Sequence, residues 1–474
     1  MSGPADPRAA VPAPAGTRAR VLTWSAVTVT AFALALVAQA VYTSDPHWGI
    51  RYMADLWVYV ASGQAVRDGV SLYDVVIMSP LYGPMPYLYP PLTAVVLFVP
   101  LTFLPFGAAG LVWNTATLIA LGAVVWISLG IAGVLRTRTR TVLTVVGLVL
   151  VFCLLPTRIH LIFGQINAFL VLLVLLDFRR GAGRWRGIGI GVAAALKVTP
   201  MIFIVYLLIT GQWRAARTAV LAFLGTVAIG FAVAPRDSLE YWGGLVFESS
   251  RAGAVYATPN QSLASAMARV FRSEVFATWW LVVLAVVGVL GLAVARHVHH
   301  RGSDFLGFCA AVLTGLLVSP VSWEHHWVYV VPLLVWLAVR AHQRRSAGLA
   351  AVTVLLSAVF TLRVFWWVGV QEFPPEPMDL NPWQQLASSM MPVAALLLLL
   401  LGPLWARHEF RSRPAGAGAG AVAQAQAPTR APAPASPAVP APAATPAPAS
   451  APDPAATPPA TSTTPVVPEP TRSG

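Results

Sequence analysis

Charge is scarce in this sequence: only 10% of its 474 residues are charged, while 57% are hydrophobic. A soluble domain usually carries about 25% charged residues, so this chain cannot cover a water-facing surface with charge. Apolar runs long enough to cross a bilayer recur from Val21 to Trp405. The low charge therefore excludes an ordinary soluble fold and predicts an integral membrane protein that crosses the bilayer several times.

Lysine and cysteine are nearly absent. Lys197 is the only lysine, so the formal net charge of +13 comes from arginine. The arginines gather in short loops between the apolar runs, which indicates a topogenic role rather than nucleic-acid binding. Cys153 and Cys309 both lie inside apolar runs, where neither a disulfide nor a metal site is indicated. The bias toward Ala, Pro, Val and Arg is typical of a GC-rich bacterial genome.

The common sequence motifs of soluble enzymes are missing too. The sequence contains no Walker loop, no dinucleotide-binding fingerprint and no nucleophile elbow. The first loop expected outside the membrane has no Asp-X-Asp pair, which argues against an obligatory divalent metal. We therefore expect neither a cofactor nor a metal ion.

Composition divides the chain into three regions. Residues 1–20 form a Pro/Ala/Arg lead, residues 21–406 the transmembrane body, and residues 407–474 an Ala/Pro-rich tail. The lead precedes about 20 apolar residues, which is a full span and not the short core of a cleavable signal. The tail has almost no large apolar side chains, so we expect it to be disordered.

The arginine-rich loops predict a topology. The positive-inside rule places them in the cytoplasm together with both termini, which leaves an all-α helix bundle with about ten full spans. Two further segments, 89–106 and 187–210, begin and end on one side and contain Pro100 and Pro200, so we expect re-entrant or broken helices. Every polar motif except Lys197 then faces the outside. Full spans are expected at 22–43, 108–133, 141–157, 166–178, 218–234, 275–295, 304–320, 327–340, 348–369 and 386–405.

Asp55 is the first candidate for chemistry. It lies in the first outer loop, at the start of a stretch with the spacing of a helix along the membrane surface. A carboxylate there can act as a general base toward a substrate hydroxyl, or it can cap the helix. Tyr59 follows on the same helix as a candidate sugar contact.

Lys197 is the sharpest anomaly. It lies deep in the broken segment 187–210, where a buried lysine costs at least about 2.5 kcal/mol at the bilayer centre. Snorkelling toward the interface is the alternative, but the position is far from the expected segment ends. We favour a phosphate-binding role.

Polar residues also enter a span from an outer helix end. Gln165 and Asn167 could bind sugar hydroxyls, while Arg158 and His160 could meet an anionic phosphate. Hydrogen bonding between helices explains the same residues equally well.

The next outer loop contains Asn260 and Gln261. We expect them to bind a polar substrate or to cap the helix that follows at Leu263.

The last group is an aromatic and polar cluster around two adjacent histidines, His325 and His326, with Trp323 and Glu324 before them. Helical neighbours one residue apart point in different directions, so a zinc site is poorly supported. An imidazolium facing a phosphate, with tryptophan stacked on a sugar, fits better. An interfacial aromatic belt is the alternative.

These motifs occur in a familiar order, and the sequence resembles glycosyltransferase family 87 from about Leu22 to Trp405. That family comprises actinobacterial polyprenyl-phosphate-mannose-dependent α-1,2-mannosyltransferases with the C-type glycosyltransferase fold. The motifs are Asp-Leu-X-Val-Tyr from Asp55, Tyr-Pro-Pro from Tyr89, Gly-Gln-X-Asn from Gly164, Ala-X-Lys-X-Thr-Pro from Ala195, Asn-Gln-Ser from Asn260, and Ser-Pro-X-Ser-Trp-X-His-His from Ser319.

The resemblance implies an inverting, nucleotide-independent transfer of mannose from a polyprenyl phosphate to a phosphatidylinositol mannoside, lipomannan or related glycolipid, outside the cytoplasm. It also implies that Asp55 is the general base. Related enzymes transfer arabinofuranose, which keeps that donor open. The main alternative that is not an enzyme is a secondary transporter, because broken helices and an intramembrane lysine are typical of that class. The candidates for holding the departing phosphate are His325, His326, Lys197, Arg158 and His160.

Overall fold

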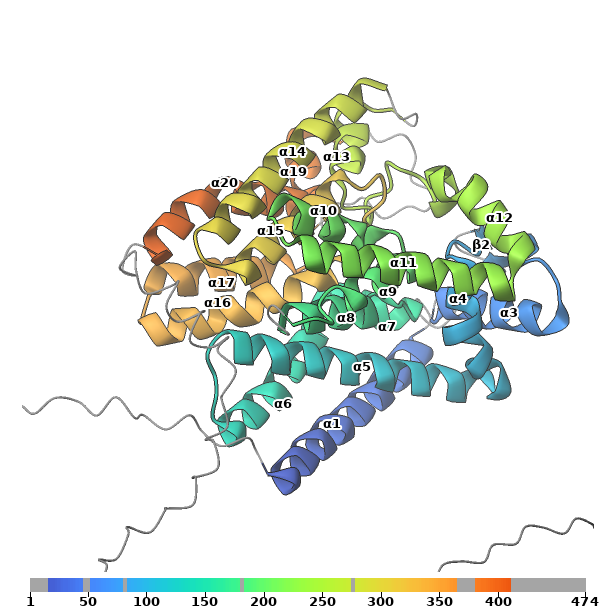
Figure 1. Cartoon of the computed structure of the whole chain (residues 1–474), viewed down its shortest axis with the longest axis horizontal. Coiled ribbons are helices and arrows are strands. Elements are labelled where there is room, and N and C mark those ends of the chain that lie inside the picture. The colour runs from blue at the N-terminus through green and yellow to red at the C-terminus, as the bar shows by residue number, and fades with distance from the viewer. Residues whose placement is uncertain are drawn as a thin grey trace, which may run out of the picture. The chain divides into compact units, whose positions relative to one another are not determined.

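The computed structural model describes residues 16–45, 52–79, 83–179, 183–273, 278–364 and 380–410. The predicted lead up to residue 15, the tail beyond residue 410 and most of the last outer loop lie outside the described residues. The described part of the chain is almost entirely helical (Figure 1).

Four helices are long and apolar enough to cross a membrane, and up to six spans result if two bent helix pairs each count as one. The described residues thus form an α-helical, multi-pass membrane protein, but the prediction of about ten full spans is not confirmed. The predicted spans at 304–320, 327–340 and 348–369 contain helices of 15, 14 and 13 residues, whereas a straight crossing needs about 20. The long helices are α1 (Thr17–Ser44), α5 (Phe106–Ile131), α11 (Trp213–Val233) and α14 (Thr278–His300), and the bent pairs are α6 (Thr137–Cys153) with α7 (Leu155–Phe163) and α19 (Pro382–Ser388) with α20 (Met390–Phe410).

Shorter elements fill the space between these helices. Three of the described helices begin at serine N-caps, where Ser262, Ser303 and Ser346 accept backbone N–H groups of the first turn. The shorter elements are α3 (Ala54–Asp68), η1 (Leu72–Asp74), α8 (Asn167–Arg179), α12 (Pro235–Gly243), η5 (Leu245–Phe247), η6 (Ser249–Ala252), α13 (Leu263–Val270), α15 (Asp304–Val318), η7 (Glu324–Val330), α16 (Val331–Arg344) and α17 (Ala347–Val359).

A small antiparallel hairpin, which the all-α prediction omitted, follows α3 and η1. Its strands are β1 (Val76–Ser79) and β2 (Gly83–Pro86), and Val76 pairs with Pro86. Four residues per strand, two of them proline in β2, do not show the alternating pattern by which a strand is recognised in sequence. The hairpin places the chain for the Tyr-Pro-Pro segment.

Both segments predicted to be broken are broken. The first consists of α4 (Pro91–Thr93), a π-helical turn η2 (Ala94–Phe98) and a 3-10 turn η3 (Val99–Phe103). The second consists of α9 (Ile188–Leu196), the 3-10 turn η4 (Thr199–Met201) and α10 (Ile202–Ile209).

Pro200 explains where the second segment breaks. A proline has no N–H for the carbonyl four residues before it, and that carbonyl belongs to Leu196. In the structure Thr93 Oγ1 donates to the Leu196 carbonyl at 2.9 Å instead. Lys197 is therefore the extended residue between two helices, with φ −154° and ψ 130°. One hydrogen bond joins the two broken segments at the lysine.

Close backbone packing holds α9 against its neighbours. A Cβ on Gly191 would lie 2.2 Å from the carbonyl oxygen of Ala219 on α11, so only glycine fits there. On the other side, the Asp177 carboxylate of α8 accepts the Ile190 N–H at 2.8 Å, a favourable place for negative charge near a helix N-terminus. These contacts fix the first turn of α9 against α8 and α11, and Lys197 follows the last residue of this helix.

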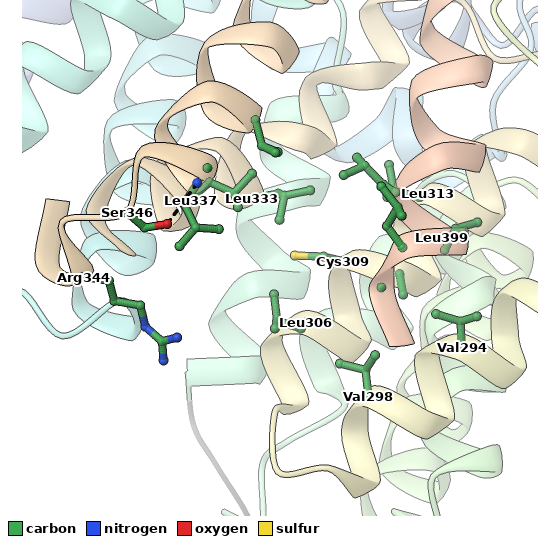
Figure 2. Close-up of a pocket in the computed structure, with 17 residues that line it drawn as sticks. Val294, Val298, Leu306, Cys309, Leu313, Leu333, Leu337, Arg344, Ser346 and Leu399 are labelled. Carbon is green, nitrogen blue, oxygen red and sulfur yellow. Dashed lines mark hydrogen bonds between the residues drawn. The ribbon is translucent and has the colours of Figure 1, made fainter. Parts of the chain in front are cut away.

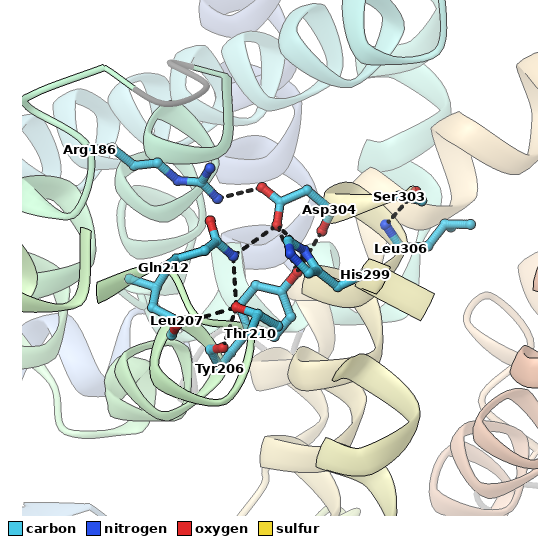
Figure 3. Close-up of polar contacts among 9 residues, drawn as sticks. All are labelled: Arg186, Tyr206, Leu207, Thr210, Gln212, His299, Ser303, Asp304 and Leu306. Carbon is cyan, nitrogen blue, oxygen red and sulfur yellow. Dashed lines mark hydrogen bonds and ion pairs between the residues drawn. The ribbon is translucent and has the colours of Figure 1, made fainter. Parts of the chain in front are cut away.

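A polar cluster lies at the opposite end of α9 (Figure 3). Arg186, just before the helix, is paired with Asp304 at the start of α15. Asp304 also accepts hydrogen bonds from Tyr206 at 2.8 Å and from Gln212 at 3.2 Å, and lies 2.9 Å from His299. The helix between the two ends is about 14 Å long at 1.5 Å per residue. The cluster thus ties together the loops before α9, after α10 and after α14.

Candidate active site

Asp55 is the second residue of α3 and does not cap it. Met53 occupies the N-cap position in a left-handed conformation, without a side-chain cap. The start of α3 lies against the end of α7, where a Cβ on Gly164 would come within 2.8 Å of the Leu56 side chain. Gly164 itself has φ +74°, so this contact needs glycine for both space and conformation. The motif that begins with Gly164 thus docks onto the helix that carries Asp55.

A chain of hydrogen bonds ends at the Asp55 carboxylate. Gln165 Nε2 donates to Asp55 Oδ2, and Gln165 Oε1 accepts from the Tyr89 hydroxyl at 3.2 Å. The Tyr59 hydroxyl in turn donates to that of Tyr89 at 2.8 Å. Because both ends of the Gln165 amide are engaged, its orientation toward Asp55 is set. Tyr59 and Gln165, predicted as sugar contacts, are here bonded to protein.

The environment of Asp55 changes its acidity. Helix α3 is not among the membrane-spanning segments. Burial raises the pKa of the Asp55 carboxyl to about 6, while the hydrogen bond from Gln165 and the charge of Lys197 act in the opposite direction. A carboxyl with a pKa near the operating pH is suited to take a proton from a hydroxyl group and later release it.

Lys197 joins Asp55 and the histidine pair in one site. Its Nζ donates to Asn167 Oδ1 at 3.0 Å and lies 3.1 Å from His326 Nε2. The ammonium also lies over the ring of Tyr89, 5.2 Å from the centroid, a distance typical of a cation–π contact. The lysine therefore meets residues from α8, η7 and the Tyr-Pro-Pro segment.

The contact with Lys197 indicates the protonation of His326. An ammonium has only donors, so His326 Nε2 accepts and the ring proton belongs on Nδ1. Among the described residues, neither His326 Nδ1 nor His325 Nε2 has a hydrogen-bond partner, although both histidines are buried. A neutral imidazole at His326 differs from the imidazolium expected from the sequence, because the lysine already supplies the positive charge.

Arg158 and His160 make contacts of another kind. His160 Nε2 accepts the backbone N–H of Ala168 at 3.0 Å and so supports the start of α8. Arg158 Nη2 donates to the Thr361 carbonyl at 3.0 Å. Neither hydrogen bond involves Asp55 or Lys197. Their predicted role with the phosphate stays a prediction.

Glu324 lies beside the histidines and carries a buried ion pair. Only 3% of Glu324 is exposed, and its Oε1 lies 3.3 Å from Arg363 Nη2. Arg363 was missed from the sequence, since it lies in the last two turns of the predicted span 348–369, where an arginine can snorkel to the interface. Trp323 pairs with Asn260 through an isolated β-bridge, which links the loop before α13 to the loop before η7.

Asn260 and Gln261 form the other half of that link. Asn260 Oδ1 accepts the Ser322 N–H at 2.9 Å, and Gln261 Nε2 donates to the Ser388 carbonyl at 2.8 Å. Both residues are fully buried, so they hold the loop that precedes the histidines. The cap of α13 is Ser262, which accepts from Ser265 N. The capping role is therefore filled by Ser262, and the substrate contact predicted for Asn260 and Gln261 stays a prediction.

Arg269 was also missed. It is 1% exposed, and its guanidinium donates to the carbonyls of Asn260 and Ser388 at 3.2 and 3.1 Å. A charged residue within an apolar, short helix was the signal available in the sequence. Its contacts brace the loop before α13.

The arrangement can carry out one kind of chemistry. A carboxylate that can accept a proton and an ammonium that can stabilise an anion are linked through Tyr89, whose hydroxyl donates to the Gln165 that holds Asp55 and whose ring lies under the ammonium of Lys197. Such a pair suits the attack of a hydroxyl group with departure of a phosphate.

Comparison with known proteins agrees with this chemistry. The model of glycosyltransferase family 87 matches residues 87–320. A polyprenol-phosphate-mannose-dependent alpha-(1-2)-phosphatidylinositol mannoside mannosyltransferase of Mycobacterium tuberculosis is 32% identical over 78% of this chain and 88% of its own length. Its namesake in Mycolicibacterium smegmatis is 34% identical over 71% and 80%, respectively.

A third relative is named for a pentamannoside acceptor. The alpha-(1-2)-phosphatidylinositol pentamannoside mannosyltransferase of Mycolicibacterium smegmatis is 30% identical over 73% of this chain and 83% of its own length. No solved structure matches. The matched lengths confirm the resemblance seen in the ordered motifs: the chain is a membrane glycosyltransferase and belongs to glycosyltransferase family 87.

Proposed function

We propose that this enzyme moves mannose from polyprenyl-phosphate mannose to a lipid-linked glycan of the phosphatidylinositol mannoside or lipomannan type, forming an α-1,2 linkage. The names of its relatives support the donor, the acceptor class and the linkage. The observation that carries the chemistry is the network from Asp55 through Gln165 and Tyr89 to Lys197.

In this proposal Asp55 is the general base. It takes the proton of the acceptor hydroxyl while the oxygen attacks the anomeric carbon of mannose. The bond from that carbon to the phosphate oxygen breaks, and the electron pair leaves with the polyprenyl phosphate from the opposite face. The result is inversion in a single step. Holding two membrane-bound substrates together supplies much of the rate.

Lys197 stabilises the departing phosphate. A leaving phosphate already carries charge and needs a cation more than a proton. We also assign His325 to the phosphate, because its Nε2 has no partner among the described residues. His326 and Asn167 orient the lysine, and Gln165 orients Asp55. Trp323 and Glu324 remain our candidates for contacting a sugar, and Arg158 and His160 for a second contact with the phosphate.

We further propose the topology expected from the arginine loops, with about ten spans, both termini in the cytoplasm and the active site outside it. Under this proposal residues 1–20 and 407–474 are cytoplasmic and 21–406 form the membrane body. Short helices can complete a crossing together with neighbouring turns. Labelling of single cysteines by an impermeant reagent tests it: a cysteine at position 68 is expected to react from outside and one at position 138 only after permeabilisation. Reaction of both from one side would contradict the topology.

The activity is tested with purified enzyme, polyprenyl-phosphate mannose and a phosphatidylinositol mannoside acceptor. We expect Asp55→Asn and Lys197→Ala to abolish transfer. Asp68→Asn is the matched control, because Asp68 ends the same helix but is exposed and bonded only to Gln64 in the described structure. Full transfer by Asp55→Asn would remove the base assignment.

The donor is tested separately. Polyprenyl-phosphate arabinose offered in place of the mannose donor is expected to give no product. Preferential transfer of arabinofuranose would replace mannose as the donor sugar without changing the roles of the residues. Movement of a sugar lipid across a vesicle membrane without transfer would instead favour a transporter.

A further inference from the structure

A short helix follows directly on a membrane span and lies outside the network around Asp55. Helix α11 is one of the four helices long and apolar enough to cross the membrane, and it ends at Val233. Helix α12 begins at Pro235, and η5 follows it. Figure 1 shows α12 beyond the end of α11, close to α4. Because only Ala234 separates the two helices, α12 must lie at the level where the span leaves the bilayer.

The exposed side of α12 is divided between apolar and charged residues. Tyr241 is buried against the protein, whereas Leu239 is 67% exposed. Arg236 and Glu240 are also exposed and lie four residues apart, so they form a charged strip beside the leucine. Phe247, in η5, is 83% exposed. Exposed apolar side chains next to a charged strip are typical of a helix that lies in the plane of a membrane surface.

The bilayer is the partner within reach of these side chains. On α11, Leu224, Ile229 and Val233 are each more than half exposed, as expected for residues that face lipid hydrocarbon. Leu239 and Phe247 follow them along the chain beyond the span. Since the bilayer covers the exposed side of α11, the same bilayer can cover the apolar strip that continues from it.

The charges and the backbone of this segment indicate its depth. Inside the bundle, a half-open hollow among α14, α15, α16, α17 and α20 has 17 lining residues, of which only Arg344, at the end of α16, is charged (Figure 2). Helix α12 instead exposes charges beside its leucine, and it gives way to a 3-10 turn at Gly244. Irregular backbone exposed to lipid does not occur within the hydrocarbon region. The segment 235–247 therefore belongs at the level of the lipid headgroups.

Contacts connect α12 to the segment that enters the active site. The Asp237 carboxylate accepts the Ser71 hydroxyl at 3.0 Å, and the ring of Tyr241 stacks on that of Tyr73 with 5.9 Å between the centroids. The Tyr73 hydroxyl donates to the Tyr89 carbonyl at 2.9 Å. The position of α12 is thereby coupled to that of Tyr89.

We propose that the segment 235–247 lies in the headgroup region of the bilayer, with Leu239 and Phe247 inserted among the upper parts of the acyl chains. In this position it holds Tyr89 at the level where lipid-linked sugars reach the site, a consequence that rests on the proposed function. Arg236 and Glu240 carry opposite charges, so the contact is hydrophobic and needs no anionic lipid.

Fluorescence quenching in phosphatidylcholine nanodiscs tests the lipid contact. Leu239→Cys, Phe247→Cys and Arg236→Cys are made singly in the full-length enzyme that also carries Cys153→Ser and Cys309→Ala, and each is labelled with bimane. We expect a nitroxide near the top of the acyl chain to quench the labels at 239 and 247 at least about twofold more than the label at 236. Aqueous iodide should give the reverse order. Leu224→Cys, inside the span, is the positive control and should be quenched by a nitroxide deep in the acyl chain.

Two results of this experiment would overturn the proposal. Iodide quenching at 239 and 247 that equals quenching at 236 would show that both side chains lie in water. Protection of both labels from nitroxide and from iodide would show that protein covers them, as in a contact between two copies of the chain.

A double variant, Leu239→Ser with Phe247→Ser, examines the coupling to the site. Both side chains are exposed, so the fold should survive. We expect mannosyl transfer in nanodiscs to fall severalfold, and transfer between detergent-solubilised substrates by detergent-solubilised enzyme to stay unchanged, because no bilayer then sets the level of the site. Arg236→Gln, on the charged strip of the same helix, is the matched control and should transfer normally in both.

Full transfer by the double variant in nanodiscs would overturn the coupling. An inactive wild type would instead count against the proposed function. The quenching results do not depend on sugar transfer, so the lipid contact and the proposed function can fail separately.

Discussion

Replacing Gln165 by leucine should move the acidic limb of the pH–rate profile to higher pH. The Gln165 amide donates to the carboxylate of Asp55, so it favours the ionised form that acts as the base. Leucine keeps most of the volume of glutamine and removes the donor. Without that hydrogen bond the pKa of Asp55 rises further above its usual range.

The size of the shift follows from the hydrogen bond. A hydrogen bond to a charged group contributes about 1.5–3 kcal/mol, and one pH unit corresponds to about 1.36 kcal/mol, so the limb should move by roughly one to two units. The wild-type limb is expected near the pKa of Asp55, about 6. Because the base must be ionised, the variant should lose roughly twofold to tenfold in kcat/KM at neutral pH and recover on the alkaline side.

The assay is kcat/KM for mannosyl transfer across the pH range, since this quantity reports the free enzyme. Gln64→Leu is the matched control: Gln64 lies on the same helix and donates to an aspartate, Asp68, at 2.9 Å, but the pair is exposed. A limb that stays in place in Gln165→Leu would refute the positioning role, and so would an equal shift in Gln64→Leu.

The remaining predictions concern the lysine, the helix that carries it and the loop beside the histidines. Lys197→Met should lower kcat by at least about a hundredfold, which is the range for removing one group that stabilises transition-state charge. Single-turnover kinetics should show that the chemical step is slower. A weaker binding of substrate with an unchanged chemical step would contradict the assigned role of the lysine. Gly191→Ala should lower the Tm by several degrees because its Cβ would collide with the backbone of α11, whereas Gly225→Ala, where the added Cβ meets nothing within 4 Å, should not. Asn260→Ala removes buried hydrogen bonds to the loop before the histidines and should cost about 1–3 kcal/mol in the free energy of unfolding, as urea denaturation would measure; unchanged stability would refute the bracing role.

Much of the site was visible in the sequence because the surroundings are so apolar. Asp55 and Lys197 stand out as charges in a chain that avoids them, and the prolines marked both broken segments. The order of motifs then led to the family. These features are local, so they can be recognised without knowing the fold.

The partners of those residues could not be predicted. Gln165 lies 110 residues from Asp55 along the chain, and an amide next to a span reads equally as a sugar contact or as a helix contact. The predicted number of spans is not confirmed for a related reason: α15 is apolar after its first residue and α16 is apolar up to Arg340, so composition suggests full crossings where the helices contain 15 and 14 residues. Length in a buried helix is decided by tertiary packing, which hydropathy does not report.

The two broken segments explain why the site lies where it does. The first places Tyr89 just before α4, and the second leaves Lys197 extended after α9. The bond from Thr93 to the Leu196 carbonyl fixes one break against the other, and it exists because Pro200 cannot use that carbonyl. An unbroken α9 would occupy that acceptor and turn position 197 into a helical residue. The irregular backbone is therefore the means by which a cation is held at the Tyr89 ring and next to His326 within an otherwise apolar bundle.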